Sequence, residues 1–482
     1  AVTYAQWAAA AEALDRALGL DSWRDDPVSP EYDHALIQRR LAELRAARAA
    51  GDTLRLLFLI RTAMSRNLGD MGNVQLYAHT HIGTKRLIEA YLAECEAALA
   101  AVVAGPVRTA AGPVDDATVL DELVRARHAF GRTALLLSGG GTMGMLHIGV
   151  IEGLLRQGLL PKVVSGSSAG AIVAASLCVR TDTEIPVFLD GFAELPLEVF
   201  EDSAAPDTAW VRIARLLKHG TWIEIRHLAG SMQAILGELT FQEAYNRTRR
   251  VLNIPVSSAG PHESGRLLNY LTAPNVLIWS AVCASCSVPL IFASNALLAK
   301  DPRTNAPVPW TPTPQRWIDG SVDNDLPMTR LTEMFNVNHF VVSQVNPHVI
   351  PFLPKASAAP VPAPPATGWP GPSLAVRAGR TLLTLVHSES MHRLTQLAEL
   401  NVLPGVALGL RSVLAQKYSG DITILPDVHA SDLASILTNP SVDFMTASRL
   451  RGNRATWPKI ELIRNHCAVE LALDRAILEM RA

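Results

Sequence analysis

The chain is poor in the features that mark several protein classes. Charged residues make up 18% and aromatic residues 6% of its 482 residues, and the net charge is −2. Because a nucleic-acid-binding protein usually has a basic excess, this balance argues against nucleic acid as a partner. Hydrophobic residues make up 49%, which indicates a globular body and excludes a disordered chain.

Cysteine is also scarce. The five cysteines are scattered along the chain, at Cys95, Cys178, Cys283, Cys286 and Cys467. An odd and scattered set does not fit a disulfide framework and favours a reducing, intracellular compartment. Cys283 and Cys286 have C-x-x-C spacing, but a zinc site of that kind needs a second pair. We therefore expect these two to pack in the core, with no metal bound.

A continuous apolar run of about 18 residues, the length that spans a bilayer, is missing as well. The nearest candidate is Leu267 to Ala299, which contains no charged residue but is interrupted by Asn269, Pro274 and Pro289. We expect this stretch to be buried core and not a transmembrane helix.

The first part of the chain is rich in Ala and Leu. Residues 1–105 predict an N-terminal helical domain, because apolar residues recur at helical spacing, for example at Ile37, Leu41 and Leu44. Residues 106–133 predict a linker with Gly-Pro pairs, followed by a lead-in helix from Asp115 to Phe130.

From residue 134 to 345, short apolar runs alternate with helical segments. Strands are predicted at Ala134–Leu137, Val163–Val164, Val276–Trp279 and Phe340–Val342. This alternation predicts an α/β fold with a mostly parallel sheet covered by helices on both faces. A capping-box match at Thr240–Glu243 predicts a helix start.

The last part of the chain differs in composition. Residues 351–372 are rich in Pro and Ala, which predicts a surface loop. Residues 373–482 are expected to form a mainly helical C-terminal extension.

The most informative stretch runs from Leu135 to Val179. It contains a strand, the turn Gly139-Gly140-Gly141, a helix, a second strand and then Gly166-Ser167-Ser168-Ala169-Gly170. A G-x-S-x-G sequence between a strand and a helix is the nucleophile-elbow pattern. We therefore hypothesise that Ser168 is a catalytic nucleophile, with Gly166 and Gly170 clearing space for the sharp turn. The N–H groups of Gly139, Gly140 and Gly141 would form its oxyanion hole.

The triple glycine has competing interpretations. Gly139 to Gly144 also fits G-x-G-x-x-G, but a dinucleotide site needs an acid about 20 residues later. Val163-Val164-Ser165-Gly166 offers no acid. A phosphate-binding P-loop is excluded too, because Met145 and Leu146 follow where Lys and Ser or Thr are required. No organic cofactor is therefore expected, and a purely structural turn remains the alternative.

A nucleophilic serine needs a base, and the residues alone leave two kinds open. In an α/β-hydrolase the base would be a downstream histidine, for which His339, His348 and His387 are the candidates. The other candidate is Asp319, which follows a short apolar strand and precedes Gly320. An acid there would lie at the carboxyl edge of a parallel sheet, where active-site groups gather.

Three motifs together resemble one family. Ser138 to Gly144, Gly166 to Gly170, and Asp319-Gly320 occur in the order and spacing of the patatin-like phospholipases. The resemblance covers about residues 134–345. It implies a Ser168–Asp319 dyad without histidine and an oxyanion hole from the glycine turn. It also implies that Ala284 to Pro289 borders the acyl pocket.

One departure points to a branch of that family. Thr142 and Met143 stand where the commoner phospholipases often have a basic residue. This feature is similar to the fungal and plant triacylglycerol lipase branch. Three other segments share that similarity: His147–Val150, Gly83–Tyr91 and Ala455–Lys459.

Some members of the branch carry an H-x-x-x-x-D motif for acyl transfer. His147 has Glu152 at the matching place, and Asp432 is too close to His429. Acyl transfer by that motif is not expected here.

A lipase must also reach lipid. Trp210 to Leu217 places apolar residues on one helical face with arginines beside it, which is typical of a helix on an anionic surface. A second candidate is the cluster from Arg449 to Lys459. We expect peripheral association with an intracellular lipid droplet or membrane, and hydrolysis of triacylglycerol. Phospholipase A or lysophospholipase activity, or a non-catalytic lipid-surface scaffold, are the alternatives.

Overall fold

The computed structural model describes most of the chain. The described residues are 1–105, 108–109, 112–194, 198–200, 221, 223, 225–258, 265–288, 291–292, 296–310, 317–319, 325–347, 349 and 418–482. Two expected features, the helix from Trp210 to Leu217 and the Pro/Ala-rich loop at 351–372, lie outside these residues.

The N-terminal part is helical, as predicted. Its elements are α1 (Tyr4–Ala17), α2 (Asp21–Asp25), α3 (His34–Ala49), α4 (Thr53–Ala63), the 3-10 turns η1 (Leu68–Asp70) and η2 (Val74–Tyr77), and α5 (Arg86–Ala104). After α5 come β1 (Arg108–Thr109) and β2 (Gly112–Pro113), which pair antiparallel, and the lead-in helix α6 (Asp116–Phe130). Ile37, Leu41 and Leu44 are buried on α3, which confirms the helical stripe read from the sequence.

The central part alternates strands and helices. Its elements are β3 (Arg132–Leu137), η3 (Gly141–Met145), α7 (Leu146–Arg156), β4 (Val163–Gly166), α8 (Ala169–Cys178), α9 (Glu184–Gly191), η4 (Phe192–Glu194), α11 (Ile225–Leu236), α12 (Phe241–Thr248), β5 (Val251–Ser258), β6 (Arg266–Leu268), α13 (Ile278–Ser285), β7 (Leu298–Lys300), β8 (Pro307–Pro309), β9 (Trp317–Asp319), α15 (Met328–Phe335) and β10 (Val337–Ser343). The capping box that begins α12 is present at Thr240 and Glu243.

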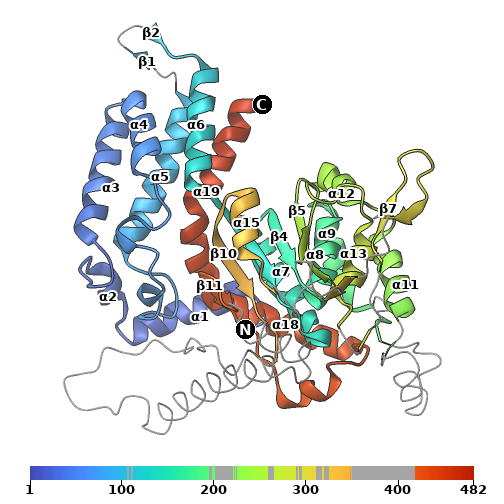
Figure 1. The fold of residues 1–482 in the computed structure, drawn as a ribbon. Helices are drawn as coiled ribbons and strands as arrows, with labels where there is room; N and C mark the ends of the chain where they lie inside the picture. The colour runs from blue at the N-terminus through green and yellow to red at the C-terminus, as the bar shows by residue number, and fades with distance from the viewer. Residues whose placement is uncertain are drawn as a thin grey trace, which may run out of the picture.

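The C-terminal part contributes to both halves of the molecule. Its elements are β11 (Ile422–Ile424), η6 (Ala430–Ser435), α18 (Val442–Thr456), η7 (Trp457–Lys459) and α19 (Ile460–Arg481). Its described residues, 418–482, are mainly helical, but β11 was not predicted and joins the central sheet beside β10. Helix α19 instead runs along α5 and α6 (Figure 1).

Among the described residues the central sheet has seven strands, in the order β11-β10-β3-β4-β5-β6, with β9 also paired to β5. The first five strands of this order are parallel, whereas β6 and β9 run antiparallel to β5. Leu135 and Leu137 of β3 pack into the core that contains α7, α8 and α13. Ala134 and Leu136, one residue out of step, pack against α15 on the other face. The predicted α/β fold is confirmed.

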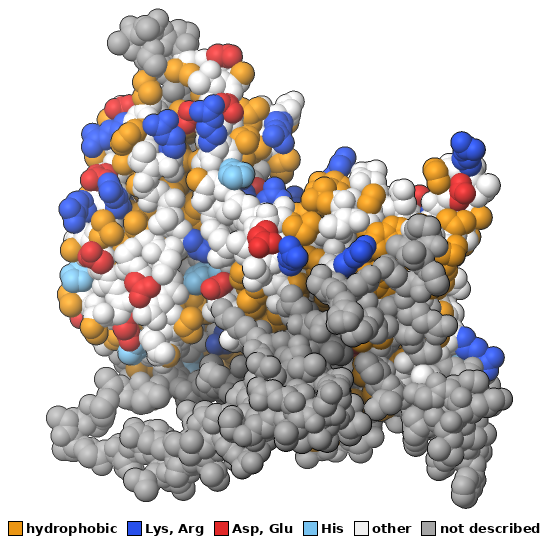
Figure 2. Space-filling view, viewed as in Figure 1, with side chains coloured by type: hydrophobic (Ala, Val, Ile, Leu, Met, Phe, Trp, Pro, Cys, Tyr) orange, Lys and Arg blue, Asp and Glu red, His pale blue; other side chains and the backbone are white. Residues whose placement is uncertain are grey.

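A second core lies within the helical bundle. It joins buried residues of α3, α4, α5 and α6 to buried residues of α19. Figure 1 shows this bundle standing beside the α/β part. On the face seen in Figure 2, basic and acidic side chains are interspersed over the bundle.

One predicted strand was wrong. The run Val276–Trp279 was expected to be a strand, but Ile278 begins helix α13, in which every residue is buried. A short apolar run does not distinguish a central strand from a buried helix, because neither leaves a polar face. Within the described part of the chain no helix has the length and apolar character needed to cross a bilayer.

Candidate active site

Ser168 lies on a sharp turn between a strand and a helix. β4 ends at Gly166, α8 begins at Ala169, and Ser168 between them has φ 52° and ψ −121°. A positive φ is costly for a residue with a side chain and persists where the surroundings impose it, most often at functional sites. The Ser168 N–H donates to Ser285 Oγ at 3.1 Å, which ties the elbow to the end of α13.

Both flanking glycines are required by close backbone contacts. A Cβ on Gly166 would lie 2.2 Å from the Gly170 carbonyl oxygen, and a Cβ on Gly170 would lie 2.2 Å from the Leu137 carbonyl oxygen. Only residues without a Cβ fit there, so the turn holds Ser168 at the carboxyl edge of the sheet, at the N-terminus of α8. The positive end of a helix favours negative charge at that position.

The glycine turn lies directly opposite. A Cβ on Gly139 would be 3.4 Å from Ser168 Cβ, so the turn and the elbow are in contact. The N–H of Gly139 donates to Asp325 Oδ1 at 3.0 Å, and that of Thr142 donates to the Ile436 carbonyl at 3.0 Å. Sequence reasoning treated the three glycines alike, whereas the structure gives the Gly139 N–H a partner of its own. Gly140 and Gly141, which line the cavity beside Ser168, are the remaining donors of the triplet.

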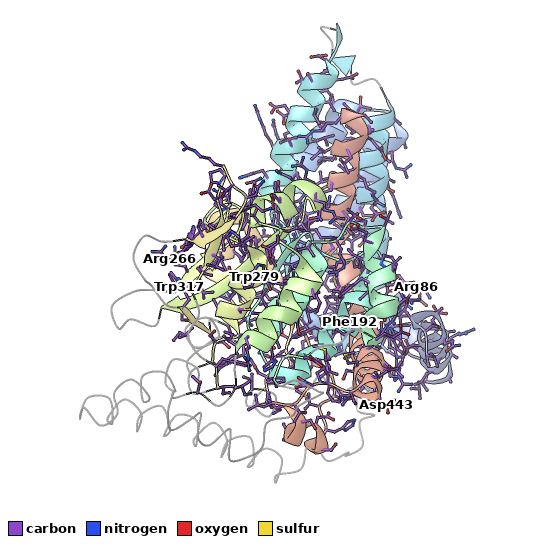
Figure 3. The ribbon with its side chains drawn as sticks, turned by 90° about the vertical axis from the view of Figure 1, so that its right-hand side faces the viewer. Arg86, Phe192, Arg266, Trp279, Trp317 and Asp443 are labelled. Carbon is purple, nitrogen blue, oxygen red and sulfur yellow. The ribbon has the colours of Figure 1, made fainter. Side chains whose placement is uncertain are left out.

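Asp319 reaches the site by an unexpected route. The sequence suggested the end of a parallel strand, but β9 runs antiparallel to β5, and Asp319 is paired with Val256. The strand is anchored by Trp317, which is 1% exposed and has the Arg266 guanidinium 5.3 Å from its ring centre. Figure 3 shows Arg266 and Trp317 beside each other. The Asp319 N–H donates to the Ser287 carbonyl at 3.0 Å, and its side chain is fully buried.

Ser168, Asp319 and the glycine turn line one cavity of about 240 Å³. The rest of the described lining is mainly apolar: Met145, Ala169, Ile172, Val199, Phe200, Cys286, Val288, Ile291, Phe292, Pro347, Ile436, Leu437 and Pro440, together with Thr142 and Asn346. Cys286 and Val288 come from the loop expected to border an acyl pocket. Burial and the charge of Asp319 raise the pKa of the Cys286 thiol well above its ordinary value, while its contact with Ser168 lowers it.

Asp325 is a functional candidate that the sequence reasoning missed. Its carboxylate accepts hydrogen bonds from the Gly139 N–H at 3.0 Å and from Asn346 Nδ2 at 2.8 Å. Burial raises its pKa to about 7, and the charge of Asp319 acts in the same direction; hydrogen bonds from Gly139, Ser167 and Asn346 oppose them. The only signal in the sequence was that Asp319 is followed by two further acids, Asp323 and Asp325, the latter directly before Leu326-Pro327.

Of the three candidate histidine bases, the structure describes only His339, and it does not lie beside Ser168. His339 lies near the start of β10, paired with Thr133, at the edge of the sheet opposite Ser168. His348 and His387 lie outside the described residues. His147 is fully buried, with Nδ1 2.8 Å from Ser343 Oγ and Nε2 3.0 Å from the Ser138 carbonyl. Burial lowers its pKa to about 4, so it supports the strand end before the glycine turn as a neutral ring.

Two other sequence features have structural explanations. Glu152, which follows His147 at acyl-transfer spacing, is held by Arg449 Nε at 2.7 Å and by Asn453 Nδ2 at 2.7 Å. His429 and Asp432 form a capping box at the start of η6.

The second lipid-binding candidate is the cluster Arg449, Arg451, Arg454, Trp457 and Lys459, in which two of the four cations are paired with carboxylates. Arg449 pairs with Glu152 and Asp190, and Arg451 pairs with Asp432. Trp457 is 4% exposed, so it belongs to the core. Periodicity alone could not show that these cations already have partners.

Cys283 and Cys286 are buried free thiols, as are the other three cysteines. Among the described residues no group of His, Cys, Asp and Glu is arranged to hold a metal ion.

A strained serine on a strand-to-helix elbow, a glycine turn and a buried aspartate around one cavity define an α/β domain of the patatin type. The patatin-like phospholipase family matches residues 135–332, and a domain of unknown function (DUF3336) matches residues 1–118. Triacylglycerol lipase 4 of Saccharomyces cerevisiae is 45% identical over 99% of this chain and 52% of its own length. Triacylglycerol lipase ptl3 of Schizosaccharomyces pombe is 40% identical over 99% of this chain and 95% of its own.

The chain belongs to the patatin-like phospholipase family, in the branch of these fungal and plant lipases with an N-terminal helical domain. A further relative, triacylglycerol lipase SDP1L of Arabidopsis thaliana, is 36% identical over 99% of this chain and 57% of its own length. The chain thus spans little more than half of the budding-yeast and plant relatives. The solved structure of VipD from Legionella pneumophila matches 70% of this chain and 67% of its own at 15% identity, with a TM-score of 0.32, too distant to inform the site.

Proposed function

We propose that the protein is a serine ester hydrolase of neutral acyl lipids, with triacylglycerol as its substrate and Ser168 and Asp319 as its catalytic dyad. One observation carries the proposal: a strained serine at a helix N-terminus and a buried aspartate face the same largely apolar cavity. The similarity to proteins named triacylglycerol lipases supports it.

The proposed reaction has two steps. Ser168 Oγ attacks the ester carbonyl while the Asp319 carboxylate accepts its proton, and the oxygen that becomes negative is stabilised by the N–H groups of Gly140 and Gly141. The ester C–O bond then breaks, and the alcohol leaves with the proton from Asp319. Water, deprotonated by Asp319, attacks the acyl-serine and releases the fatty acid, and the proton returns to Ser168.

The lining of the cavity favours a neutral substrate over a phospholipid. Asp319 is its only charged residue among the described ones, and none of these is Lys or Arg. A phosphodiester is best bound by charge-assisted hydrogen bonds from cations. Phospholipase A or lysophospholipase activity remains the alternative, because the same dyad serves any acyl ester that enters.

We propose peripheral action at an intracellular lipid droplet or membrane surface. Leu437 lines the cavity and is 36% exposed, and Leu433 and Val442 near it in the chain are 47% and 59% exposed. Apolar side chains exposed beside a cavity mouth suit contact with a lipid surface. All five cysteines are free, as suits a reducing compartment. Replacing Leu433 and Val442 by Ser should reduce flotation with triolein emulsions; unchanged flotation would reject this surface.

The test of the reaction compares emulsified triacylglycerol with phospholipid as substrates. Wild type should prefer triacylglycerol, and Ser168→Ala and Asp319→Asn should each lose roughly 10³-fold or more of its activity. Ser176→Ala is the matched control: Ser176 is a buried serine of α8 that hydrogen-bonds within its own helix, to the Ile172 carbonyl at 2.8 Å.

Three results would contradict the proposal. Full activity of Ser168→Ala would exclude the serine mechanism. A preference for phospholipid would favour the phospholipase alternative. Binding of both lipids by wild type without hydrolysis of either would favour a scaffold.

A further inference from the structure

The cavity has a wall that comes from far along the chain. Ile436, Leu437 and Pro440 line it together with the elbow and the glycine turn. These residues belong to the segment 436–440, which lies between η6 and α18. The segment is outside both domain-family matches, which end at residues 118 and 332.

Thr142 fastens this segment to the glycine turn. Its N–H donates to the Ile436 carbonyl at 3.0 Å. Its hydroxyl lies 2.9 Å from the Ile436 carbonyl and 2.8 Å from the Thr438 carbonyl, within donating distance of both. Thr142 is 3% exposed. A lysine or arginine here would have to bury a cation under the segment, which is costly without a paired anion.

Gly141 lets the segment approach closely. A Cβ on Gly141 would lie 2.5 Å from the Ile436 carbonyl oxygen and 2.9 Å from Ile436 Cγ2. The turn that offers its N–H groups to the substrate is therefore in direct contact with the segment. A shift of one would move the other.

The segment also organises the far side of the cavity. Asn439 Oδ1 accepts hydrogen bonds from the N–H of Val199 at 3.0 Å and from the N–H of Phe200 at 2.9 Å. Both of these residues line the cavity. Downstream, α18 fixes the end of the segment, because Arg449 and Asn453 bind Glu152 of α7.

We propose that residues 436–440 are the specificity-determining wall of the acyl pocket and that Thr142 is the positioning residue that holds it. This deepens the function proposed above and rests on it. The fatty acyl chain of the substrate would lie against Ile436, Leu437 and Pro440, so the position of the segment sets which chain lengths fit. Thr142 touches no reacting atom and acts through the segment and the glycine turn.

The wall is tested by changing the size of Leu437. Rates are measured on p-nitrophenyl butyrate, octanoate and palmitate, which share a leaving group and differ in acyl length. Leu437→Trp should lower kcat/KM for palmitate by about tenfold or more relative to butyrate. Leu478→Trp is the control, because Leu478 is an exposed leucine of α19 that does not line the cavity. If Leu437→Trp keeps the wild-type chain-length profile, the wall is rejected.

The anchor is tested by a pair of substitutions at Thr142. Thr142→Val keeps the shape but removes the hydroxyl, and Thr142→Ser keeps the hydroxyl. We expect Thr142→Val to lower kcat for all three esters and to alter their ratio, and Thr142→Ser to restore both. A merely structural role would lower the melting temperature of Thr142→Val and leave the ratio unchanged, which would reject the anchor.

Failure of this inference is separable from failure of the proposed function. Labelling with a fluorophosphonate probe reports a reactive Ser168 independently of chain length. Hydrolysis and labelling with an unchanged length profile in Leu437→Trp and Thr142→Val reject only the wall. If the wild-type protein shows neither ester hydrolysis nor labelling, the Ser168–Asp319 dyad is rejected, and the proposed wall is rejected as well.

Discussion

The two edges of the central sheet each hold buried polar residues, but they are built differently. At the carboxyl edge, Ser168 is strained and shares an apolar cavity with Asp319. At the amino edge, Glu470 of α19 accepts the Thr133 N–H at 3.0 Å and pairs with Arg66 and Arg127, each at 2.9 Å. One edge has polar groups that line a cavity, and the other has charged groups that pair with one another.

The difference teaches how to separate function from structure among buried polar groups. Glu470 and its cations join α19, α6 and the chain after α4 to the sheet, so they hold the helical bundle in place. His339 and His466 complete this cluster, with His339 Nε2 3.0 Å from His466 Nδ1. Backbone strain and an adjoining cavity are found at the other edge, where we propose that the chemistry takes place. Substitutions at the two edges should therefore affect different properties.

The largest contrast is expected between Ser168→Ala and Glu470→Gln. The first should abolish activity and leave the free energy of unfolding almost unchanged. The second breaks a buried ion pair at both arginines and should lower that free energy by about 3 kcal/mol, while the folded fraction keeps its specific activity. Urea unfolding and ester hydrolysis on the same samples check both. A large loss of specific activity in folded Glu470→Gln would contradict the assignment of catalysis to one edge of the sheet and of stability to the other.

A second contrast compares two glycines. Gly170→Ala places a Cβ 2.2 Å from the Leu137 carbonyl oxygen, so the elbow must move, and a shift of about 1 Å can cost on the order of 10²-fold in rate. Gly131, at the amino edge, has φ 81° and ψ −175°, a region that costs other residues about 1–3 kcal/mol. Gly131→Ala should therefore lose stability but keep its kcat. Equal kcat losses in the two variants would remove the distinction.

The smallest contrast is in the pH dependence of stability. Burial raises the pKa of Asp325 to about 7. The protonated carboxyl therefore adds to the free energy of unfolding below about pH 4, and this stabilisation is lost as the pH rises to about 7. Burial lowers the pKa of His466 to about 4, so its contribution is complete above about pH 6.5 and is lost as pH falls to about 4.

The two contributions overlap and partly cancel in wild type, so variants are needed to separate them. The unfolding free energy of wild type minus that of Asp325→Asn should fall from pH 4 to 7 and then level. The same difference for His466→Gln should rise from pH 4 to 6.5 and then level. Urea titrations at pH 5, 6, 7 and 8 measure both curves, and slopes of the same sign would contradict the assignment.

Sequence patterns can predict those parts of the candidate site whose residues lie close together in the chain. The elbow depends on Gly166 and Gly170, and the fold on apolar strands that alternate with helices, both of which are visible in short windows. The strand direction of β9 and the bond between Gly139 and Asp325 depend on contacts between distant segments. No periodicity marks Ile436 as a neighbour of Thr142, since nearly 300 residues separate them.

The strand predicted at Val276–Trp279 was wrong, and the ion pairs of Arg449 could not be foreseen, for a related reason. An apolar run specifies burial but not backbone conformation, and a basic residue specifies charge but not whether a carboxylate already neutralises it. Each question is settled only when the partner segment is known, as Glu152 shows for Arg449.

The place of α19 in the helical bundle has a consequence for biosynthesis. The bundle core needs Leu473 and Ile477 of that helix, yet the last of its other helices, α6, ends at Phe130. At about 5–20 residues per second, a ribosome needs roughly 20 to 70 s to go from α5 to α19. During that interval the apolar faces of the first helices lack their last partner. The nascent chain should be a client of chaperones until its C-terminal helix emerges, and translation stalled before residue 460 should leave the N-terminal helices sensitive to protease.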